Sequence, residues 1–376
     1  MHVVVVGGSF AGVAVAQECA ARGAHVTLVE PREGVWIAYA MLRASVVACE
    51  GLGVMVVPLD RIFSASARRG GRCRIVRGWA DGVDLKAGAV SVRVVGARAD
   101  AGAGAGAGAG AAPPSGAASG AAGAIGAAAV PGADAGRPPA EPQLLLSLPY
   151  TVLVLATGCV PSYAPVRADD DFSMGVLRAN IAESTGAAQR ARSFVVCGGG
   201  ATGIDVASEL RLEYPNASVT LVHRGPMLLS NPLYGLNYSV AVRMKAKAQL
   251  EARGISVLCE TEVLGRPEAA DGGGSGAAPS PLRFIGGSIV VGEMVLQLRK
   301  CGLGGSAGLL RCDFLTYATG PLPATRWLRQ SQSLPAASFG PHGRLRVDDA
   351  YRLRGTGGEV FALGDACDSL DPKTAA

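Results

Sequence analysis

The stretch HVVVVGGSFAG, from His2 to Gly12, decides the fold. Four consecutive valines predict a buried strand that ends in a glycine turn, and the small residues that follow, AGVAVAQECAARG, favour a helix. A second apolar run, HVTLVE, ends at Glu30. The order of strand, glycine turn, helix and strand predicts a βαβ unit in an α/β fold with a parallel sheet.

The glycine turn has the spacing of a dinucleotide-binding loop. Such a loop places glycine first, third and sixth, for the tight turn, the close approach of a pyrophosphate, and the packing of helix on strand. Serine replaces the middle glycine here, and the six residues are Gly7, Gly8, Ser9, Phe10, Ala11 and Gly12. The helix amino terminus offers N–H groups to a phosphate, and Glu30 can accept both hydroxyls of an adenosine ribose. We expect nucleotide binding at this turn, against the alternative of an ordinary glycine-rich connection.

The same order of elements recurs about 190 residues later. The run SFVVCGGGATG matches all three glycine positions, with Gly198, Gly200 and Gly203. The second strand of this unit ends in His223 and Arg224 and carries no acid. A carboxylate there would repel a 2′-phosphate, whereas these two side chains can accept one, so NADPH is a candidate donor. The alternative is that Arg224 faces solvent.

Three further runs complete the pattern. VLVLATG ends in Thr157 and Gly158, and FLTYATG ends at Gly320, so that Ala-Thr-Gly closes a strand in each unit. Near the end of the sequence, FALGDACD places Gly364 and Asp365 after another strand. In a protein with two such units the first commonly holds FAD, and a carboxylate at a strand end can accept hydrogen bonds from ribityl hydroxyls. We expect Asp365 to do this, with a helix after Gly364 pointing its amino terminus at the flavin; the alternative role is a helix cap.

Composition limits the other classes of function. The chain has 376 residues, enough for two domains, and its net charge of +5 is dispersed rather than clustered among aromatic residues, so no nucleic-acid partner is indicated. None of the nine cysteines forms a CxxC or CxxxxC pair, so neither a metal site nor a redox dithiol is indicated. Residues 96–142 and 271–281 are rich in glycine and alanine and predict disordered insertions.

These observations predict two Rossmann-like dinucleotide-binding domains, the NAD(P)-binding domain inserted into the FAD-binding domain. We expect residues 1–165 to form the first part of the FAD domain, with the insertion at 96–142. Residues 166–314 form the NAD(P) domain and residues 315–376 form the second part of the FAD domain.

The order of the motifs resembles the pyridine nucleotide–dependent FAD oxidoreductases, and within them the apoptosis-inducing factor 2 group, also called ferroptosis suppressor proteins. The likeness rests on HVVVVGGSFAG, MLRASV, VLATG, GGGATGIDVASELRLEYPNASVTLVH, YATG and VFALGDACD followed by DPK. It implies that Gly7 to Ala11 bind FAD, with Arg43 near the flavin nucleotide, Ala80 meeting adenine through its backbone, and Asp365 on the ribityl chain. It also implies Asp205 near the nicotinamide–flavin contact and a Pro-Lys pair at Lys373; these two are the candidate catalytic residues.

The resemblance implies that hydride passes from NAD(P)H to FAD and that the electrons pass on to an acceptor, with a quinone as the expected small-molecule partner. It also implies a carboxyl-terminal domain that this sequence lacks. Two alternatives are a flavoprotein that acts as a non-catalytic binding or scaffold protein, and a type II NADH dehydrogenase, which predicts an acid at His223. The scattered cysteines favour a cytoplasmic location and leave peripheral membrane association open. The sequence does not indicate an oligomeric state.

Overall fold

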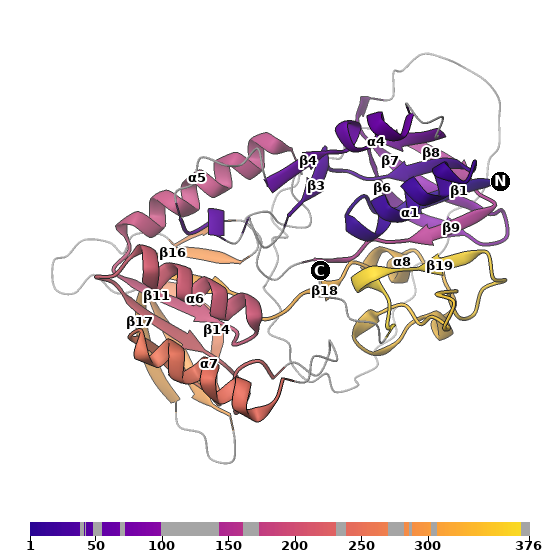
Figure 1. Ribbon diagram of the computed structural model, residues 1–376. Helices are drawn as coiled ribbons and strands as arrows, with labels where there is room; N and C mark the ends of the chain where they lie inside the picture. Colours follow the sequence, from indigo (N-terminus) through magenta and orange to yellow (C-terminus); the bar gives the residue numbers. More distant parts are fainter. Residues whose placement is uncertain are drawn as a thin grey trace, which may run out of the picture.

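The computed structural model describes residues 1–37, 41, 43–47, 55–67, 72–98, 143–160, 173–230, 238–269, 282–285, 288–301 and 307–369. Two large sheets organise them, the first parallel and the second mixed. The first sheet lies in the lobe at the right of Figure 1 and the second in the lobe at the left. The two expected insertions lie outside the described residues, apart from residues 96–98 at the start of the first.

The first sheet is parallel throughout and has the strand order β19-β9-β1-β2-β5. The helices α1 and α4 pack on one of its faces around Val5, Leu28 and Phe63. A three-stranded sheet and the chain after residue 326 cover the other face. The elements are β1 (His2–Val6), α1 (Phe10–Ala21), β2 (His25–Val29), α4 (Leu59–Ala67), β5 (Arg72–Val76), β9 (Val152–Leu155) and β19 (Val360–Ala362).

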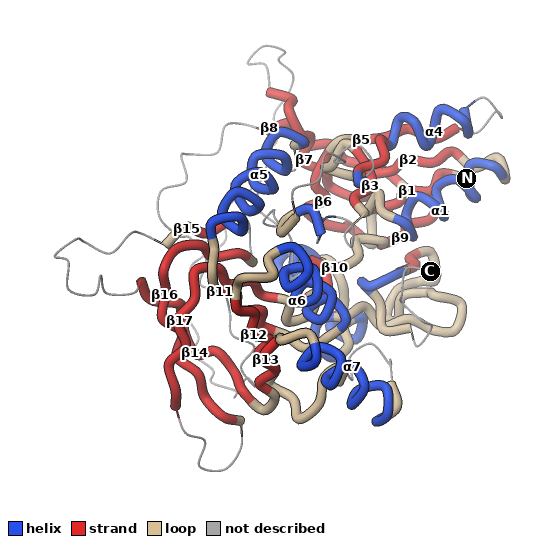
Figure 2. Tube along the Cα trace, turned by 60° about the vertical axis from the view of Figure 1, so that its left-hand side comes forward, coloured by secondary structure: helices blue, strands red, loops and turns tan. Residues whose placement is uncertain are grey.

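The second sheet has the order β13-β12-β11-β17-β16-β14, with β15 also paired to β16. Its first four strands are parallel, and β16 turns the sheet antiparallel. The helices α6 and α7 pack on one face in both views (Figures 1 and 2). The elements are β11 (Ser193–Cys197), α6 (Ala201–Glu213), β12 (Ser218–Val222), α7 (Val240–Ala252), β13 (Ile255–Leu258), β14 (Thr261–Ala269), β15 (Arg283–Ile285), β16 (Ile289–Lys300) and β17 (Ala307–Tyr317).

The second unit is inserted into the first. The strand β19 pairs with β9, although the whole second sheet lies between them in the sequence. This confirms the predicted insertion of one Rossmann-like unit in the other. The strand β17 continues to Tyr317, so the second sheet runs past residue 314, where the sequence placed a domain boundary.

The two connections between the units pair with each other. The strands β10 (Cys159–Val160) and β18 (Leu322–Pro323) each follow an Ala-Thr-Gly run, and they form a two-stranded antiparallel ribbon. The helix α5 (Met174–Arg190) then leads into the second unit, with the Ser173 hydroxyl accepting the Val176 N–H as an amino-terminal cap. The paired connections hold the two Ala-Thr-Gly runs side by side.

The remaining elements are short. The strands β6 (Gly78–Asp84), β7 (Ala89–Arg98) and β8 (Gln143–Pro149) form the three-stranded sheet, so residues 99–142 connect two paired antiparallel strands. A two-stranded ribbon joins β3 (Gly34–Trp36) to β4 (Val56–Pro58). The helix α8 (Arg326–Gln330) and three 3₁₀ turns, Ala336–Ser338, Pro341–Gly343 and Gly364–Ala366, complete the described chain.

The close packing at Gly203 provides a test of the fold. A Cβ atom there would lie 1.7 Å from the Gly198 carbonyl oxygen, whereas one at Gly200 would meet no atom within 4 Å. We expect Gly203→Ala to lower the free energy of unfolding by about 3 kcal/mol, because neither the glycine turn at Gly198 nor helix α6 can move away without losing its own packing. The control Gly200→Ala has room for its Cβ and a φ of −79° that suits any residue, so it should lower the free energy of unfolding by about 1 kcal/mol at most, the cost of alanine at the amino-terminal cap of α6. Urea unfolding measures the stability of both variants, and equal losses would contradict the inferred close contact between Gly203 and Gly198.

Candidate functional site

The first glycine turn packs closely against the backbone of the first Ala-Thr-Gly run, residues 156–158. Gly7 has φ +108°, and a Cβ there would lie 2.2 Å from the carbonyl oxygen of Ala156. A Cβ at Gly12 would lie 1.8 Å from the Gly7 carbonyl oxygen. Only glycine fits either position, so the turn, the start of α1 and the end of β9 meet at one edge of the sheet. Ser9, at the amino-terminal cap of α1, makes no side-chain capping bond, and Phe10 is half exposed.

The second turn repeats this geometry. Gly198 has φ +119°, and a Cβ there would lie 2.1 Å from the Ala318 carbonyl oxygen. The backbone bonds correspond as well: Ala156 N–H donates to Val6 O at 2.8 Å, and Ala318 N–H donates to Cys197 O at 2.6 Å. Each unit therefore brings one helix amino terminus to the carboxyl edge of its sheet, beside an Ala-Thr-Gly run.

The Gly-Asp run at Gly364 and Asp365 lies near the first glycine turn. A Cβ at Gly364 would lie 3.3 Å from the Ala11 Cβ, so this run lies against the first turn of α1. The Asp365 carboxylate accepts a hydrogen bond from the Cys159 thiol at 3.3 Å. Burial, and then the negative charge of Asp365, raises the pKa of Cys159 to about 12, which keeps this thiol protonated at neutral pH.

The helix expected after Gly364 is absent from the described residues. The chain makes one 3₁₀ turn, Gly364–Ala366, and Cys367 is already extended. Its backbone bonds go to another segment instead, since Leu345 N–H donates to Ala366 O and Asp368 N–H donates to Leu345 O. The prediction of a helix pointing from Asp365 was therefore wrong within residues 364–369.

Two features at this edge leave room for a ligand. The Thr157 hydroxyl is buried without a hydrogen bond. Gly158 has φ +66° and open space on its Cβ side. A buried hydroxyl without a partner costs about 1–3 kcal/mol, so it marks a place where a ligand group could bond.

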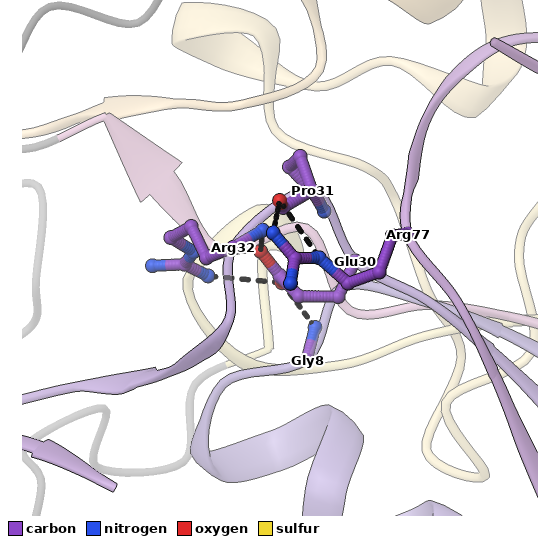
Figure 3. A network of polar contacts seen from close by, with 5 residues as sticks. All are labelled: Gly8, Glu30, Pro31, Arg32 and Arg77. Carbon is purple, nitrogen blue, oxygen red and sulfur yellow. Dashed lines mark hydrogen bonds and ion pairs between the residues drawn. The ribbon is translucent and has the colours of Figure 1, made fainter. Parts of the chain in front are cut away.

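Glu30 lies at the end of β2, where the sequence placed it, and its carboxylate is fully engaged (Figure 3). Oε2 accepts the Gly8 N–H at 2.6 Å and Arg32 Nη2 at 3.0 Å, while Oε1 accepts the Arg32 backbone N–H at 3.0 Å and Nε at 2.6 Å. Glu30 is 1% exposed. Burial alone would raise its pKa, but the charge and hydrogen bonds of Arg32, with the Gly8 N–H, outweigh it and lower the pKa.

Arg32 was not anticipated from the sequence. Two residues after Glu30, it turns back on the carboxylate and lies over the Trp36 ring, with 5.6 Å between its Cζ and the ring centroid. The neighbouring loop is fixed as well, since Arg77 donates to the Pro31 carbonyl at 2.9 and 3.2 Å (Figure 3). An arginine two positions after the acid could have been noted, but its conformation depends on the loop around it.

Arg43 contacts the second unit in this structure. It forms an ion pair with Glu209 on α6. Asp205, one helical turn earlier on α6, has its pKa raised by partial burial and then by the charge of Glu209. The structure thus brings together Arg43 from the first part of the chain and the acid-bearing face of α6.

The segment around Arg43 is docked by hydroxyl groups. Three consecutive backbone carbonyls accept side-chain hydroxyls: Ala44 from Thr185 at 3.1 Å, Ser45 from Ser184, and Val46 from Tyr214 at 2.6 Å. Val46 and Val47 are buried in the core of the second unit. Residues 43–47 are therefore fixed to α5 and α6 of the second unit.

The other expected site residues are placed as follows. Ala80 lies in β6 beside Val92, next to a bulge. Arg224 follows β12 and is exposed, and Gly320 follows β17 with φ +101°. Lys373 lies outside the described residues. The described residues include no cluster of three or more metal-ligating side chains and no helix long and apolar enough to cross a membrane.

Comparison with known families decides the class of protein. A model of the pyridine nucleotide-disulphide oxidoreductases matches residues 143–376, more than half of the chain, and a second model with the same description matches residues 2–42. The chain belongs to the pyridine nucleotide-disulphide oxidoreductase family. This confirms the predicted resemblance and implies an NAD(P)H-dependent flavin oxidoreductase with a flavin and a nicotinamide cofactor.

Within this family the chain is similar to ferroptosis suppressor protein 1. Identity to the Homo sapiens protein is 26% over 230 residues, which cover 61% of this chain and 53% of that protein. Identity to the Mus musculus protein is 22% over 375 residues, which cover 100% of this chain and 76% of that protein. The chain spans about half the length of several of the curated relatives it matches.

Solved structures share the fold. An engineered water-forming NADPH oxidase bound to NADPH has a TM-score of 0.61 and 15% identity, covering 98% of this chain and 63% of its own. The water-forming NADH oxidase from Lactobacillus brevis bound to NADH has a TM-score of 0.57 and 16% identity, covering 98% and 62%. Thioredoxin reductase from T. acidophilum has a TM-score of 0.52 and 15% identity, covering 99% and 93%. These likenesses confirm the two-domain fold.

The Glu30–Arg32 pair predicts a pH-dependent contribution to stability. We expect Glu30→Gln to lower the free energy of unfolding by about 3 kcal/mol at pH 7, because Arg32 loses a buried counter-charge. A lowered folded-state pKa stabilises the protein above the ordinary glutamate pKa of about 4.3, and this contribution is lost as the pH falls through the folded-state value. The difference between the two proteins should therefore shrink in acid.

The exposed neighbour provides the control for this measurement. Glu33→Gln alters a side chain at the surface of the same loop and should unfold like the native protein at every pH. Urea unfolding between pH 3 and pH 7 measures the three proteins. A Glu30→Gln variant that matches the native protein at pH 7 would contradict the role given to this pair.

Proposed function

We propose that this protein binds FAD at the first glycine turn and NAD(P)H at the second, and that it reduces a quinone. The supporting observation is the repeated geometry: two glycine turns, each closed on the carbonyl oxygen of an Ala-Thr-Gly alanine, with a helix amino terminus at the carboxyl edge of its sheet. The overall reaction combines NAD(P)H, a proton and a quinone to give NAD(P)⁺ and the quinol. The quinone is the acceptor that the family resemblance implies.

The residues at the first turn fit FAD. The buried Thr157 hydroxyl without a partner lies beside Gly7, where only glycine allows the close approach. Gly7 to Gly12 would hold the pyrophosphate through backbone N–H groups, and Asp365 would accept hydroxyls of the ribityl chain. When bound, the flavin accepts hydride from the reduced nicotinamide and gives the electrons to the second substrate.

Glu30 needs a rearrangement to bind a ribose. An ionised carboxylate offers about four acceptor positions, and four protein N–H groups already lie within 3.0 Å of its oxygens. A ribose hydroxyl can therefore bond to Glu30 only where Arg32 gives up one of its contacts. The freed guanidinium remains beside the site as a cation for the nucleotide phosphates.

Asp205 and Glu209 are acids of α6, and Arg43 from the first part of the chain forms an ion pair with Glu209. This pair would help to set the position of the nicotinamide relative to the flavin. We propose Asp205 as the acid nearest that contact. The raised pKa of Asp205 favours its protonated form more than in an exposed aspartate.

A direct experiment tests the overall reaction. The purified chain is incubated with FAD, freed of excess, and examined by absorbance before and after NADPH or NADH is added without oxygen. We expect a flavin spectrum that bleaches with either donor and recovers when a short-chain ubiquinone is added. A flavin that bleaches but does not recover with quinone would exclude this acceptor, and a chain that retains no flavin would exclude the proposal.

Asp365 provides a more specific prediction. Asp365→Ala should lose at least about tenfold in FAD affinity, because a charge-assisted hydrogen bond contributes about 1.5–3 kcal/mol. Asp349→Asn, an exposed acid on the preceding segment, is the matched control and should bind FAD normally. Quenching of flavin fluorescence measures both. Unchanged FAD affinity in Asp365→Ala, with unfolding like that of the native protein, would remove this residue from the site.

A further inference from the structure

His223 occupies, in the second unit, the position that Glu30 has in the first. Each residue stands next after the second strand of its unit, after β2 or β12. Gly8 N–H donates to Glu30 Oε2 at 2.6 Å, and Gly199 N–H donates to His223 Nδ1 at 3.1 Å. The second residue of each glycine turn therefore bonds to the side chain at the end of the neighbouring strand, and in the second unit that side chain is an imidazole.

The hydrogen bonds of His223 define a neutral ring. Nδ1 accepts the Gly199 N–H, so the ring proton is on Nε2, which lies 3.0 Å from the Met227 carbonyl oxygen and 3.1 Å from Ser230 Oγ. Protonation of Nδ1 would set two N–H groups against each other. Burial also lowers the pKa of His223. This place in the second unit is thus uncharged at neutral pH, whereas the first unit has a carboxylate there.

The ring is also fixed by two glycines. A Cβ at Gly199 would lie 2.7 Å from His223 Cγ, and a Cβ at Gly225 would lie 2.7 Å from both His223 Nε2 and Ser230 Oγ. The turn and the loop after β12 close on the imidazole from both sides. The His223 ring is therefore held in one orientation at the carboxyl edge of the second sheet and does not extend into solvent.

Two arginines lie at the same edge. Arg224 is exposed and directly follows His223. Because α7 connects two parallel strands, β12 and β13, its first turns lie at their carboxyl edge, and Arg243 is in these turns. Within the described residues, the buried Nε of Arg243 has no hydrogen-bond partner. An acidic residue, Glu260, also lies close to Arg224 in the structure, since its backbone N–H donates to the carbonyl oxygen of the next residue, Gly225, at 3.0 Å.

We propose that this edge selects the 2′-phosphate of NADPH over the free 2′-hydroxyl of NADH. The inference rests on the proposed function, which places a nicotinamide nucleotide at the second turn. A dinucleotide whose pyrophosphate lies at the amino end of α6 brings its adenosine ribose to the end of β12. There a carboxylate would accept the 2′-hydroxyl and repel a phosphate. The neutral His223 removes that repulsion, and Arg224 and Arg243 supply the cations that a phosphate requires.

Two small ligands test the preference for a 2′-phosphate in a binding experiment that requires neither bound flavin nor enzyme activity. Adenosine 2′,5′-bisphosphate and adenosine 5′-monophosphate differ by the 2′-phosphate alone. Isothermal titration calorimetry measures the dissociation constant of each for the full-length chain. We expect the bisphosphate to bind about tenfold tighter or more, with a ratio that falls as salt is raised. Arg224→Ala should remove most of this ratio, and Arg243→Ala should reduce it, with the affinity for the monophosphate little changed.

Arg253→Ala is the matched control, since it removes an arginine from the opposite end of α7 and should leave the ratio unchanged. Equal affinity of the native chain for the two ligands would overturn the inference, and so would an unchanged ratio in Arg224→Ala. An enzyme that reduces quinone equally fast with NADPH and NADH, with equal Michaelis constants, would overturn the inference alone. A chain that selects the bisphosphate but never bleaches a bound flavin would support the inference and overturn the proposed function.

Discussion

The structure depends on one backbone contact that is made twice. In each unit the first glycine of the turn lies against a carbonyl oxygen just after the neighbouring strand of the sheet, β9 or β17. Gly7 lies on Ala156 and Gly198 on Ala318, at distances that leave no room for a Cβ. This contact fixes the start of the following helix over the carboxyl edge of the sheet. Because both Ala-Thr-Gly runs lead into paired strands, β10 and β18, the same contact also fixes where the chain leaves one unit for the other.

On this common backbone, the two units differ in charge. The first unit has a buried carboxylate that is held by an arginine, and the second has a neutral imidazole beside two arginines. Since the backbone at the two turns is nearly the same, we propose that the side chain after the second strand decides which sugar substituents each edge can accept. The fold thus accounts for two similar glycine turns, and the coenzyme preferences that we propose follow from a few side chains at the strand ends.

Much of this could be predicted from the sequence, because glycine spacing and apolar runs report local backbone geometry. The strands and both glycine turns were predicted in this way. The contacts of Arg32, the thiol of Cys159 on Asp365, and the docking of residues 43–47 by Thr185, Ser184 and Tyr214 were not. Each joins side chains whose directions are set by tertiary packing. The prediction of a helix after Gly364 was wrong for the same reason, since Ala366 and Asp368 form their backbone hydrogen bonds with Leu345 instead.

We propose that the repeated contact builds two separate nucleotide sites in one chain. Titration calorimetry with FAD, followed by NADP⁺ on the FAD-saturated protein and then the reverse order, tests for two sites directly. We expect one FAD and one NADP⁺ to bind per chain in either order, with neither ligand displacing the other. Competition of the two ligands for a single site, or binding of only one of them, would rule out two separate sites.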